Sequence, residues 1–393
     1  MATFDVLLKG GRVLDPAQGI DATLDIGAKH GRITALEADL PTDDAWLVLD
    51  VADHFVTPGL IDLHAHLYWG GTDLGVLPDP MCLTAGVTTA ADAGSAGWAN
   101  FTGFRHFIIG QARTRAFAFV NISSIGITDM RVGENLNLQY CGVEDAIKTI
   151  EANRDVAIGV KVRVAKPICG PNGLEPLRRA AAVRDATGTR MMVHISDSEQ
   201  YMSEILPILK PGDIITHCFT GRGRLILDQQ RRTVLPEVRA AQQNGIAFDV
   251  GHGQGSFSFA VARDALADGF LPDTISTDLH NYSAHATALS LPDVMSKFLY
   301  LGRDVPDVVA RATRNAAAAI DMSDSLGHLR VGGVADIAAL RVESGPYPML
   351  DAEGSTRTGE QHLEATYTIR AGEVYNQTGR PVRRWYGPRP QEG

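Results

Sequence analysis

The stretch TPGLIDLHAH, residues 57–66, is the part of the sequence that decides the fold. Its apolar run predicts a buried β-strand that ends in two histidines, His64 and His66, separated by one residue. Side chains two residues apart on a strand point to the same face, so the two imidazoles would converge. Converging imidazoles at the end of a buried strand suit a divalent metal of the zinc type. Because such a pair also arises by chance on protein surfaces, the rest of the chain has to supply further ligands.

Length and composition restrict the class of protein. The chain has 393 residues, which suits a barrel of about 250 residues with a smaller module beside it. With 45% hydrophobic and 21% charged residues it has the profile of a soluble globular protein. A net charge of −10 and the lack of a basic run argue against nucleic-acid binding. Four cysteines without C-x-x-C spacing exclude a disulfide scaffold and a thiolate zinc cage.

The location of the protein is predicted from what the sequence lacks. The N-terminus does not have the basic-then-apolar layout of a signal peptide. No apolar run approaches the ~20 residues that a membrane span needs. We therefore expect a cytoplasmic protein that does not associate with a membrane.

Both ends of the chain show short apolar runs separated by glycine and aspartate, which is typical of β-hairpins and meanders. In the first 55 residues the runs fall at 4–9, 12–15, 25–27, 32–36 and 47–50, with Gly10-Gly11 between the first two. Similar runs return at 332–340 and 365–375, where Gly372 is expected in a hairpin turn. Pro346, Pro348 and Gly354 indicate a looser connection between them. We predict one small β-sandwich domain made from residues 1–55 and 326–393.

Residues 56–325 alternate strand-like apolar runs with helix-like segments, a pattern that favours βα units and parallel strands. We expect strands near residues 59–66, 86–92, 116–123, 157–164, 191–196, 213–218, 246–251 and 274–278. Helices are expected at 143–154, 174–187 and 304–320. One unit per roughly 33 residues is close to the average of a (β/α)₈ barrel. The predicted fold class is therefore α/β: a (β/α)₈ TIM-type barrel with the small β-sandwich domain attached.

The strand expected at 157–164 carries two basic residues, Lys161 and Arg163. Its even positions are isoleucine and valine, which would pack under helices, and its odd positions would face the barrel lumen. A lysine or arginine inside a barrel costs several kcal/mol unless it is paired or ligated. Both residues are therefore candidates for chemistry, with a structural salt bridge as the alternative.

Three later strands end in a residue that can bind a metal. His194 and His217 lie near the ends of the fifth and sixth expected strands, and Asp278 ends the eighth. Each alone has an ordinary explanation, a satisfied core histidine or a helix N-cap. Functional side chains of such barrels gather at the carboxyl ends of the strands. We expect these residues there together: His64, His66, Lys161, His194, His217 and Asp278.

In these residues the chain resembles the amidohydrolase superfamily of metal-dependent hydrolases, over nearly its whole length. PGLIDLHAH resembles the opening of the barrel in that family, and VGGVADI, residues 331–337, resembles its return into the flanking β-domain. The resemblance implies two divalent metal ions, Zn²⁺ first, with Mn²⁺, Co²⁺ or Fe²⁺ as alternatives. It implies that one metal is held by His64, His66 and Asp278, and the other by His194 and His217. Lys161, carboxylated by CO₂ to N6-carboxylysine, would bridge both.

The resemblance also implies the chemistry. A free lysine ammonium would repel two cations, whereas its carbamate is an oxygen ligand that can span them. Metal coordination lowers the pKa of bound water toward ~7, which would give a metal-bridging hydroxide as the nucleophile. Asp278 would act as the catalytic residue that takes the proton and passes it to the leaving group. The implied reaction is hydrolysis of an amide, ester or related carbonyl bond.

Within the superfamily the sequence resembles the dihydroorotase-like deacetylase branch. A dihydroorotase would be expected to carry an arginine where this chain has Tyr68. GVKVR, residues 159–163, and FDVGHG, residues 248–253, resemble hydrolases of acetylated small carboxylic acids. The expected function is a metal-dependent deacetylase or esterase that removes an acetyl group from an acetylated 2-hydroxy acid or an N-acetyl amino acid.

Four residues are candidates for substrate binding. Arg163 would share the lumenal face of Lys161 and could hold a substrate carboxylate; pairing with an aspartate or with the carbamate is equally consistent. His252 could touch substrate from a loop or lie exposed. His280 could orient Asp278, bind substrate or belong to a helix entry, and Tyr68 could line the pocket.

Two rival functions remain open. One is a cyclic amidase of the dihydroorotase or hydantoinase type. The other is an inactive barrel that serves as a scaffold, which the presence of every expected ligand disfavours. The expected partner is a small-molecule carboxylate, with no nucleic acid and no membrane, and a homo-oligomer is compatible with a barrel of this size.

Overall fold

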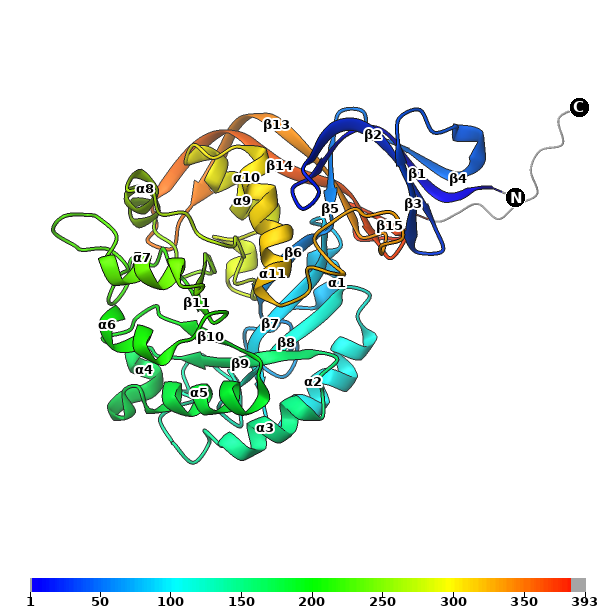
Figure 1. Cartoon of the computed structure of the whole chain (residues 1–393). Coiled ribbons are helices and arrows are strands. Elements are labelled where there is room, and N and C mark those ends of the chain that lie inside the picture. Colours follow the sequence, from blue (N-terminus) through cyan, green and yellow to red (C-terminus); the bar gives the residue numbers. More distant parts are fainter. Residues whose placement is uncertain (1, 383–393) are drawn as a thin grey trace, which may run out of the picture.

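A computed structural model of the chain describes residues 2–382 and contains two β-sheets. One is a parallel sheet of seven strands in chain order, and the other has eight strands drawn from both ends of the chain. Figure 1 shows the parallel strands and their helices in one body, with the second sheet curving over one side of it. The prediction of an α/β barrel with an additional β-structure built from both ends is confirmed. Residues 383–393 of the predicted β-domain lie outside the described residues.

The parallel sheet forms the wall of the barrel. Its strands are β6 (Leu60–Ala65), β7 (Val87–Gly97), β8 (Arg115–Asn121), β9 (Ala157–Arg163), β10 (Arg190–His194), β11 (Ile214–Thr216) and β12 (Ala247–Asp249). Val160 and Val162 of β9 join the large hydrophobic core. The alternation of this strand therefore turns Lys161 and Arg163 the other way, toward the lumen.

The eighth predicted strand, 274–278, differs from the prediction because this segment is not a regular strand. It forms single parallel bridges, Asp249 with Thr274 on one side and Ala65 with Leu279 on the other. Asp278 has a φ of 49°, a left-handed conformation that no regular strand contains. The segment nevertheless closes the ring between β12 and β6.

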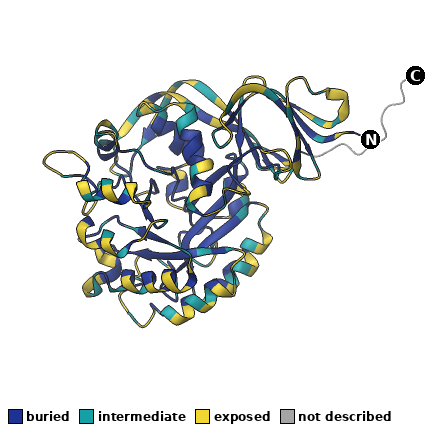
Figure 2. Ribbon diagram, in the orientation of Figure 1, coloured by how far each residue is buried: buried dark blue, intermediate teal, exposed yellow. Residues whose placement is uncertain are grey.

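The helices lie outside the barrel wall, and Figure 2 shows the strands buried behind helices with exposed outer faces. The α-helices are α1 (Pro78–Cys82), α2 (Phe101–Phe107), α3 (Val143–Glu151), α4 (Lys166–Cys169), α5 (Glu175–Thr187), α6 (Met202–Ile205), α7 (Pro236–Gln243), α8 (Phe259–Ala267), α9 (Leu291–Tyr300), α10 (Val305–Ala312) and α11 (Arg314–Ala319). Short 3₁₀ turns occur at Thr42–Asp44, Ile109–Gln111, Gly170–Asn172, Leu206–Ile208 and Ser283–His285. The helix expected at 304–320 is two helices, because Thr313 leaves the helical region at φ −131° and ψ −91°.

The second sheet joins the two chain ends through β5. Its strands are β1 (Phe4–Asp15), β2 (Ile20–Lys29), β3 (Arg32–Glu37), β4 (Ala45–Asp50), β5 (Phe55–Pro58), β13 (Ile337–Leu350), β14 (Thr356–Arg370) and β15 (Glu373–Asn376). β5 pairs with β1 on one side and with β13 on the other. β1 pairs with β4 along its first half and with β5 near its end, so the sheet folds over a core of its own.

Glycines and prolines near the two chain ends have defined places in the second sheet. Gly10-Gly11 does not separate two strands but lies in a register shift inside β1. Pro346 and Pro348 lie within β13, not in a looser connection; β5 pairs only with residues 337–340, so the prolines lie beyond the part of β13 that β5 covers. The hairpin turn at Gly372 is confirmed between β14 and β15.

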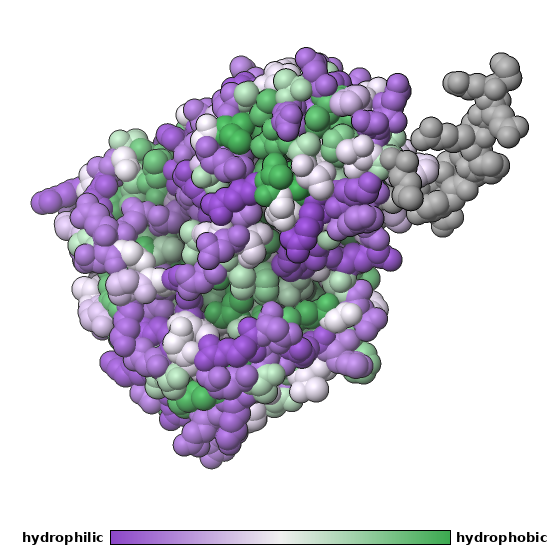
Figure 3. Space-filling view, turned by 45° about the vertical axis from the view of Figure 1, so that its right-hand side comes forward, coloured by the Kyte–Doolittle hydropathy of each residue, from purple (hydrophilic) through white to green (hydrophobic). Residues whose placement is uncertain are grey.

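The surface is largely hydrophilic, and Figure 3 shows hydrophobic residues in smaller patches between the charged and polar ones. Within residues 2–382, no helix combines the length and the apolar character needed to cross a membrane.

Candidate metal centre

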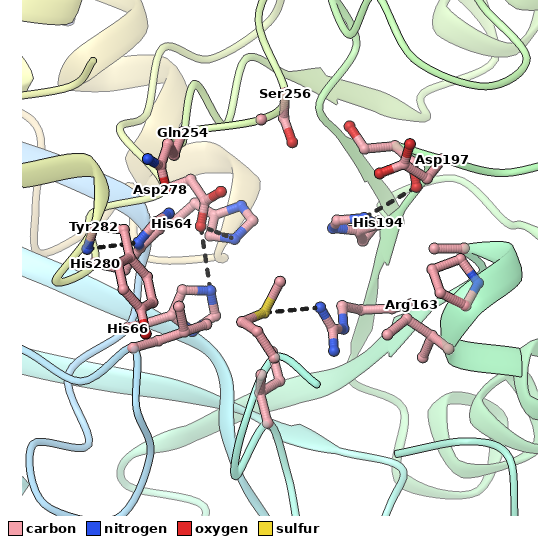
Figure 4. A pocket seen from close by; sticks show the side chains of 18 of the residues that line it. His64, His66, Arg163, His194, Asp197, Gln254, Ser256, Asp278, His280 and Tyr282 are labelled. Atoms are coloured by element: carbon pink, nitrogen blue, oxygen red, sulfur yellow. Dashed lines mark hydrogen bonds and ion pairs between the residues drawn. The ribbon is translucent and has the colours of Figure 1, made fainter. Parts of the chain in front are cut away.

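A cavity of about 580 Å³ opens where the barrel strands end. Residues predicted for the site line it from several strands and from the closing segment (Figure 4). These lining residues are His64, His66, Lys161, Arg163, His194, Asp278 and His280. His217, the sixth predicted ligand, is buried directly behind them, with its ring centroid 4.2 Å from that of His194.

Asp278 lies at the middle of the histidine cluster. Its Oδ1 is 3.2 Å from Nε2 of His64 and 3.2 Å from Nε2 of His66. One ligand atom each from His64, His217 and Asp278 lie within 4.8 Å of one another, and all three residues are buried. The structure therefore brings residues that are more than 200 positions apart in sequence into one cluster.

Hydrogen bonds outside the cluster decide which nitrogen His194 and His217 turn inward. His217 donates from Nδ1 to the carbonyl of Gly251 at 2.6 Å. Its Nε2 is buried and has no hydrogen-bond partner among the described residues. His194 donates from Nε2 to the carbonyl of Ser196 at 3.2 Å, which leaves Nδ1 bare. A neutral imidazole with one N–H fixed by the protein and one bare nitrogen is the form that binds a metal.

Hydroxyl groups hold His64 of β6 and His66, which follows this strand. His64 Nδ1 lies 2.8 Å from Thr216 Oγ1, whose own proton goes to Asp249 Oδ2 at 2.8 Å. His64 therefore donates from Nδ1, and its Nε2 is the nitrogen that faces Asp278 Oδ1. His66 Nδ1 lies 2.8 Å from Ser95 Oγ. Two further hydroxyls, those of Thr274 and Ser276, donate to the buried carboxylate of Asp249.

Lys161 is buried beside the cluster without an acidic partner. Its Nζ lies 3.5 Å from His64 Nε2 and 3.4 Å from Met192 Sδ, and no carboxylate of residues 2–382 forms an ion pair with it. Burial lowers the pKa of Lys161 to about 7, so a large part of the amine is neutral at physiological pH. A methyl group at Gly94 would lie 2.6 Å from Lys161 Cγ, so this glycine makes the room for the lysine.

Burial also keeps two histidines of the site neutral. It lowers the pKa of His217 to about 3 and that of His280 to about 4. His280 Nδ1 accepts the backbone N–H groups of Tyr282 and Ser283, each at 3.2 Å. The neutral ring of His280 therefore carries its proton on Nε2 and is a hydrogen-bond donor.

The backbone packs closely against the side chains of the cluster and is locally strained. His217 has a φ of 71° and Asp278 a φ of 49°, in the left-handed region that non-glycine residues rarely adopt. A methyl group at Gly251 would lie 2.2 Å from Thr216 Oγ1, and one at Gly253 would lie 2.2 Å from Asp278 Oδ2. Only glycine fits at either position.

The residues present fit a divalent cation. The cluster offers the neutral imidazole of His217, whose buried Nε2 has no partner among residues 2–382, together with His64 and the carboxylate of Asp278 at the same point. Imidazole and carboxylate are the ligands that zinc-type ions take in proteins.

Arg163 makes a contact that sequence reasoning missed. Its Nε and Nη2 donate to the two carboxylate oxygens of Glu134 at 2.7 and 2.6 Å, and both side chains are buried. Its Nη1 faces Met130 Sδ at 3.5 Å. One N–H on each of Nη1 and Nη2 remains without a partner in these bonds. Glu134 and Met130 belong to the loop between β8 and α3, where no periodic pattern points to a pocket.

Two predicted substrate residues lie away from the cavity. His252 is fully buried and its Nε2 accepts a hydrogen bond from Lys297 Nζ at 3.0 Å. Tyr68 packs against Phe104, with ring centroids 4.9 Å apart, and its hydroxyl faces a backbone carbonyl. Neither lines the pocket, so the structure places both as supports behind it. Both residues lie on loops, where the sequence does not indicate the direction in which a side chain points.

No protein-family model matches the chain. A deacetylase from Agrobacterium fabrum is 36% identical over 346 residues, 88% of this chain and 84% of that protein. A deacetylase from Brucella anthropi is 35% identical over 357 residues, 90% of this chain and 88% of that protein.

Two solved structures resemble the whole chain. A crystal structure of an adenine deaminase has a TM-score of 0.88 and 29% sequence identity, covering 95% of this chain and all (100%) of that one. A crystal structure of a dihydroorotase has a TM-score of 0.86 and 33% identity, covering 94% and 97%. The likeness extends over both sheets, because it covers nearly all of this chain.

Proposed function

The chain belongs to the amidohydrolase superfamily, among its deacetylase-like members, and on that premise we propose that it removes the acetyl group from small acetylated carboxylic acids. The superfamily makes it a metal-dependent hydrolase; the acetylated 2-hydroxy or amino acid is the part that we propose. One observation carries the proposal: a single cavity contains both the histidine and aspartate cluster and the guanidinium of Arg163.

We infer two divalent ions at this centre. His64, His66 and Asp278 would hold one, His194 and His217 the other, and Lys161, as N6-carboxylysine, both. Carboxylation joins the neutral lysine nitrogen to the carbon of CO₂ and releases one proton. The unpartnered Nε2 of His217 and the low pKa of Lys161 support this assignment. When bound, such ions polarise a carbonyl oxygen and make water a nucleophile at neutral pH.

The side chains of the chain have distinct tasks in this proposal. Asp278, between two histidine nitrogens, accepts a proton from water and returns it to the departing oxygen or nitrogen. His280 donates from Nε2 toward the cavity and stays neutral, because its pKa is about 4. The ester or amide bond then breaks into acetate and the free hydroxy or amino acid.

Arg163 supplies the recognition of the acid. Because Glu134 occupies Nε and one N–H of Nη2, the remaining N–H groups of Nη1 and Nη2 form an edge that can bind a substrate carboxylate. Apolar side chains that also line the cavity would contact the substituent of the acid: Leu74, Ile127, Met130 and Ile168.

A panel of substrates tests the function. Protein loaded with zinc or manganese is expected to release acetate from acetylated 2-hydroxy acids or N-acetyl amino acids. The same preparation is offered dihydroorotate and hydantoins, since a dihydroorotase structure is 33% identical to this chain. Ring opening without acetate release would replace the deacetylase proposal by a cyclic amidase.

The role of Arg163 can be separated from folding by a choice of substrate. The double variant Arg163→Gln/Glu134→Gln removes both charges, so neither is left buried and unpaired. A lost charged hydrogen bond of about 1.5–3 kcal/mol should lower kcat/KM for the carboxylate substrate about 10–100-fold.

The control is the primary amide of the same acetylated acid, which has no carboxylate to lose. Its kcat/KM should change little between wild type and variant. An equal fall for the acid and the amide would mean that Arg163 does not bind the carboxylate.

A further inference from the structure

Lys297 on α9 is a buried cation that the proposed reaction does not use. Only 1% of its surface is exposed. Its ammonium lies 3.0 Å from His252 Nε2, 3.0 Å from the carbonyl of Leu350 and 3.5 Å from Asp293 Oδ2. It also donates to the carbonyl of Thr287. An ammonium is costly to bury, and here three direct hydrogen bonds and one ion pair offset that cost.

The acceptors of Lys297 belong to segments of the chain that are far apart in sequence. Leu350 ends β13, so one bond reaches the β13–β14 hairpin of the second sheet. The tip of this hairpin also contacts the start of α8, where Ser258 Oγ donates to Glu353 Oε2 at 2.7 Å. Figure 1 shows the hairpin extending from the second sheet across α9 toward α8.

Two of the bonds of Lys297 lead to the same carbonyl, that of Gly253. His252 accepts from Lys297 at Nε2, so its proton is on Nδ1 and goes to the carbonyl of Gly253 at 2.9 Å. Thr287, whose own carbonyl accepts from Lys297, donates from Oγ1 to the carbonyl of Gly253 at 2.8 Å. The imidazole is further fixed by stacking on Phe257, with centroids 4.5 Å apart.

Gly253 is in turn the backbone that faces Asp278. Its N–H donates to the carbonyl of Thr277, one residue before Asp278, at 2.8 Å. Its Cα faces the carboxylate so closely that a methyl group there would lie 2.2 Å from Asp278 Oδ2. A shift of Gly253 therefore moves either the carboxylate or the peptide that carries it.

We propose that Lys297 is a positioning residue of the metal centre. Through His252 and Thr287 it holds Gly253 against Asp278, and through Leu350 it ties this contact to the hairpin of the second sheet. Without Lys297 the carbonyl of Gly253 is free to move. Asp278 then loses the backbone contact that fixes its orientation.

The test compares the cobalt-substituted wild type with Lys297→Met, in the absence of substrate. Visible d–d absorption reports the arrangement of ligands around Co²⁺, independently of which substrate the enzyme takes. We expect the absorption spectrum of Lys297→Met, normalised to bound cobalt, to differ in band shape from that of the wild type. Its kcat should fall about 10–100-fold, the range found when groups that orient metal ligands are removed.

Two variants separate positioning from stability. Ser296→Ala is the matched control: Ser296 is fully buried beside Lys297, and its hydroxyl accepts from the N–H of Leu363 on β14 at 2.8 Å, without contact to His252. It should lower stability and leave the cobalt spectrum unchanged. Lys297→Arg, which can still donate to several carbonyls, should restore part of the wild-type spectrum and rate.

The outcomes that overturn the proposal are distinct. A Lys297→Met protein with the wild-type spectrum and kcat per cobalt would show that Lys297 only stabilises the fold. If Lys297→Met does not fold, Thr287→Val removes one donor to Gly253 and should shift the spectrum in the same direction; an unchanged spectrum would overturn the proposal. A wild-type chain that binds no cobalt would overturn both this inference and the metal centre.

Discussion

Replacing Asp278 by asparagine is expected to lower kcat by about 10²–10⁴-fold, the usual contribution of a positioned acid–base group. The amide has nearly the shape of the carboxylate and can still face His64 and His66. It cannot accept a proton from water and return it to the leaving group. The loss should therefore fall on kcat more than on KM.

The measurement is acetate release, expressed per bound metal, because Asp278 is also a proposed ligand. Asp185→Asn, a partly exposed aspartate paired with Arg184 and Lys210, serves as the control and should keep the wild-type rate. An Asp278→Asn enzyme that retains wild-type kcat at full metal content would remove Asp278 from the reaction.

The second large effect is expected for Lys161→Ala. Without its side chain nothing joins the two proposed metal positions, so both metal content and activity should collapse, the latter by at least as much as in Asp278→Asn. Lys166→Ala removes a nearby, exposed lysine that pairs with Glu199, and should keep both. Full activity in Lys161→Ala would show that Lys161 does not bridge two metals.

The pH dependence of reconstitution tests the same lysine. Only the neutral amine reacts with CO₂, and the pKa of Lys161 in the metal-free protein is about 7. Below that pH the ammonium predominates, and recovery of activity from metal at a fixed concentration of dissolved CO₂ should be slow. Recovery should accelerate as the pH rises through about 7 and then level off. A lysine with an ordinary pKa of about 10.4 would give a rate that keeps rising well above neutral pH.

Much of the fold could be predicted because its signals are local. The alternation of side chains in β9, with valines outward and Lys161 and Arg163 inward, follows from the geometry of a strand. The same holds for the histidines that end β6 and β10. The carboxyl ends of parallel strands meet at one face of a barrel, so placing the strands was enough to bring these residues together.

The supporting residues could not be predicted, because their partners are set by packing. Glu134 lies in a loop without periodicity, and nothing in the sequence connects it with Arg163, 29 residues later. Lys297 stands in an apolar helix, where its burial shows only once the hairpin of the second sheet covers α9. An aspartate inside a buried strand, as at Asp62 and Asp249, was a usable signal, since buried carboxylates need several donors.

The eighth strand shows another limit. The segment 274–278 was predicted as a strand from its place in the alternation of strands and helices, but its backbone is shaped by Asp62, which accepts from the N–H and the hydroxyl of Thr277. This contact joins residues 215 positions apart and precedes the left-handed turn at Asp278. Secondary-structure propensity depends on residues that are neighbours along the chain, so it contains no information about such a contact.

The pairing of β5 with β13 has a consequence for how the protein is made. The register places Pro58 opposite Ile337, so the whole barrel is synthesised between the two halves of one sheet. As the chain emerges from the ribosome, β1 to β5 are complete first, and the edge of β5 has no partner until the last strands follow. An uncovered strand edge is a site for association with other chains. The nascent protein is therefore most exposed to aggregation while its barrel is being translated, and the arrival of β13 ends that interval.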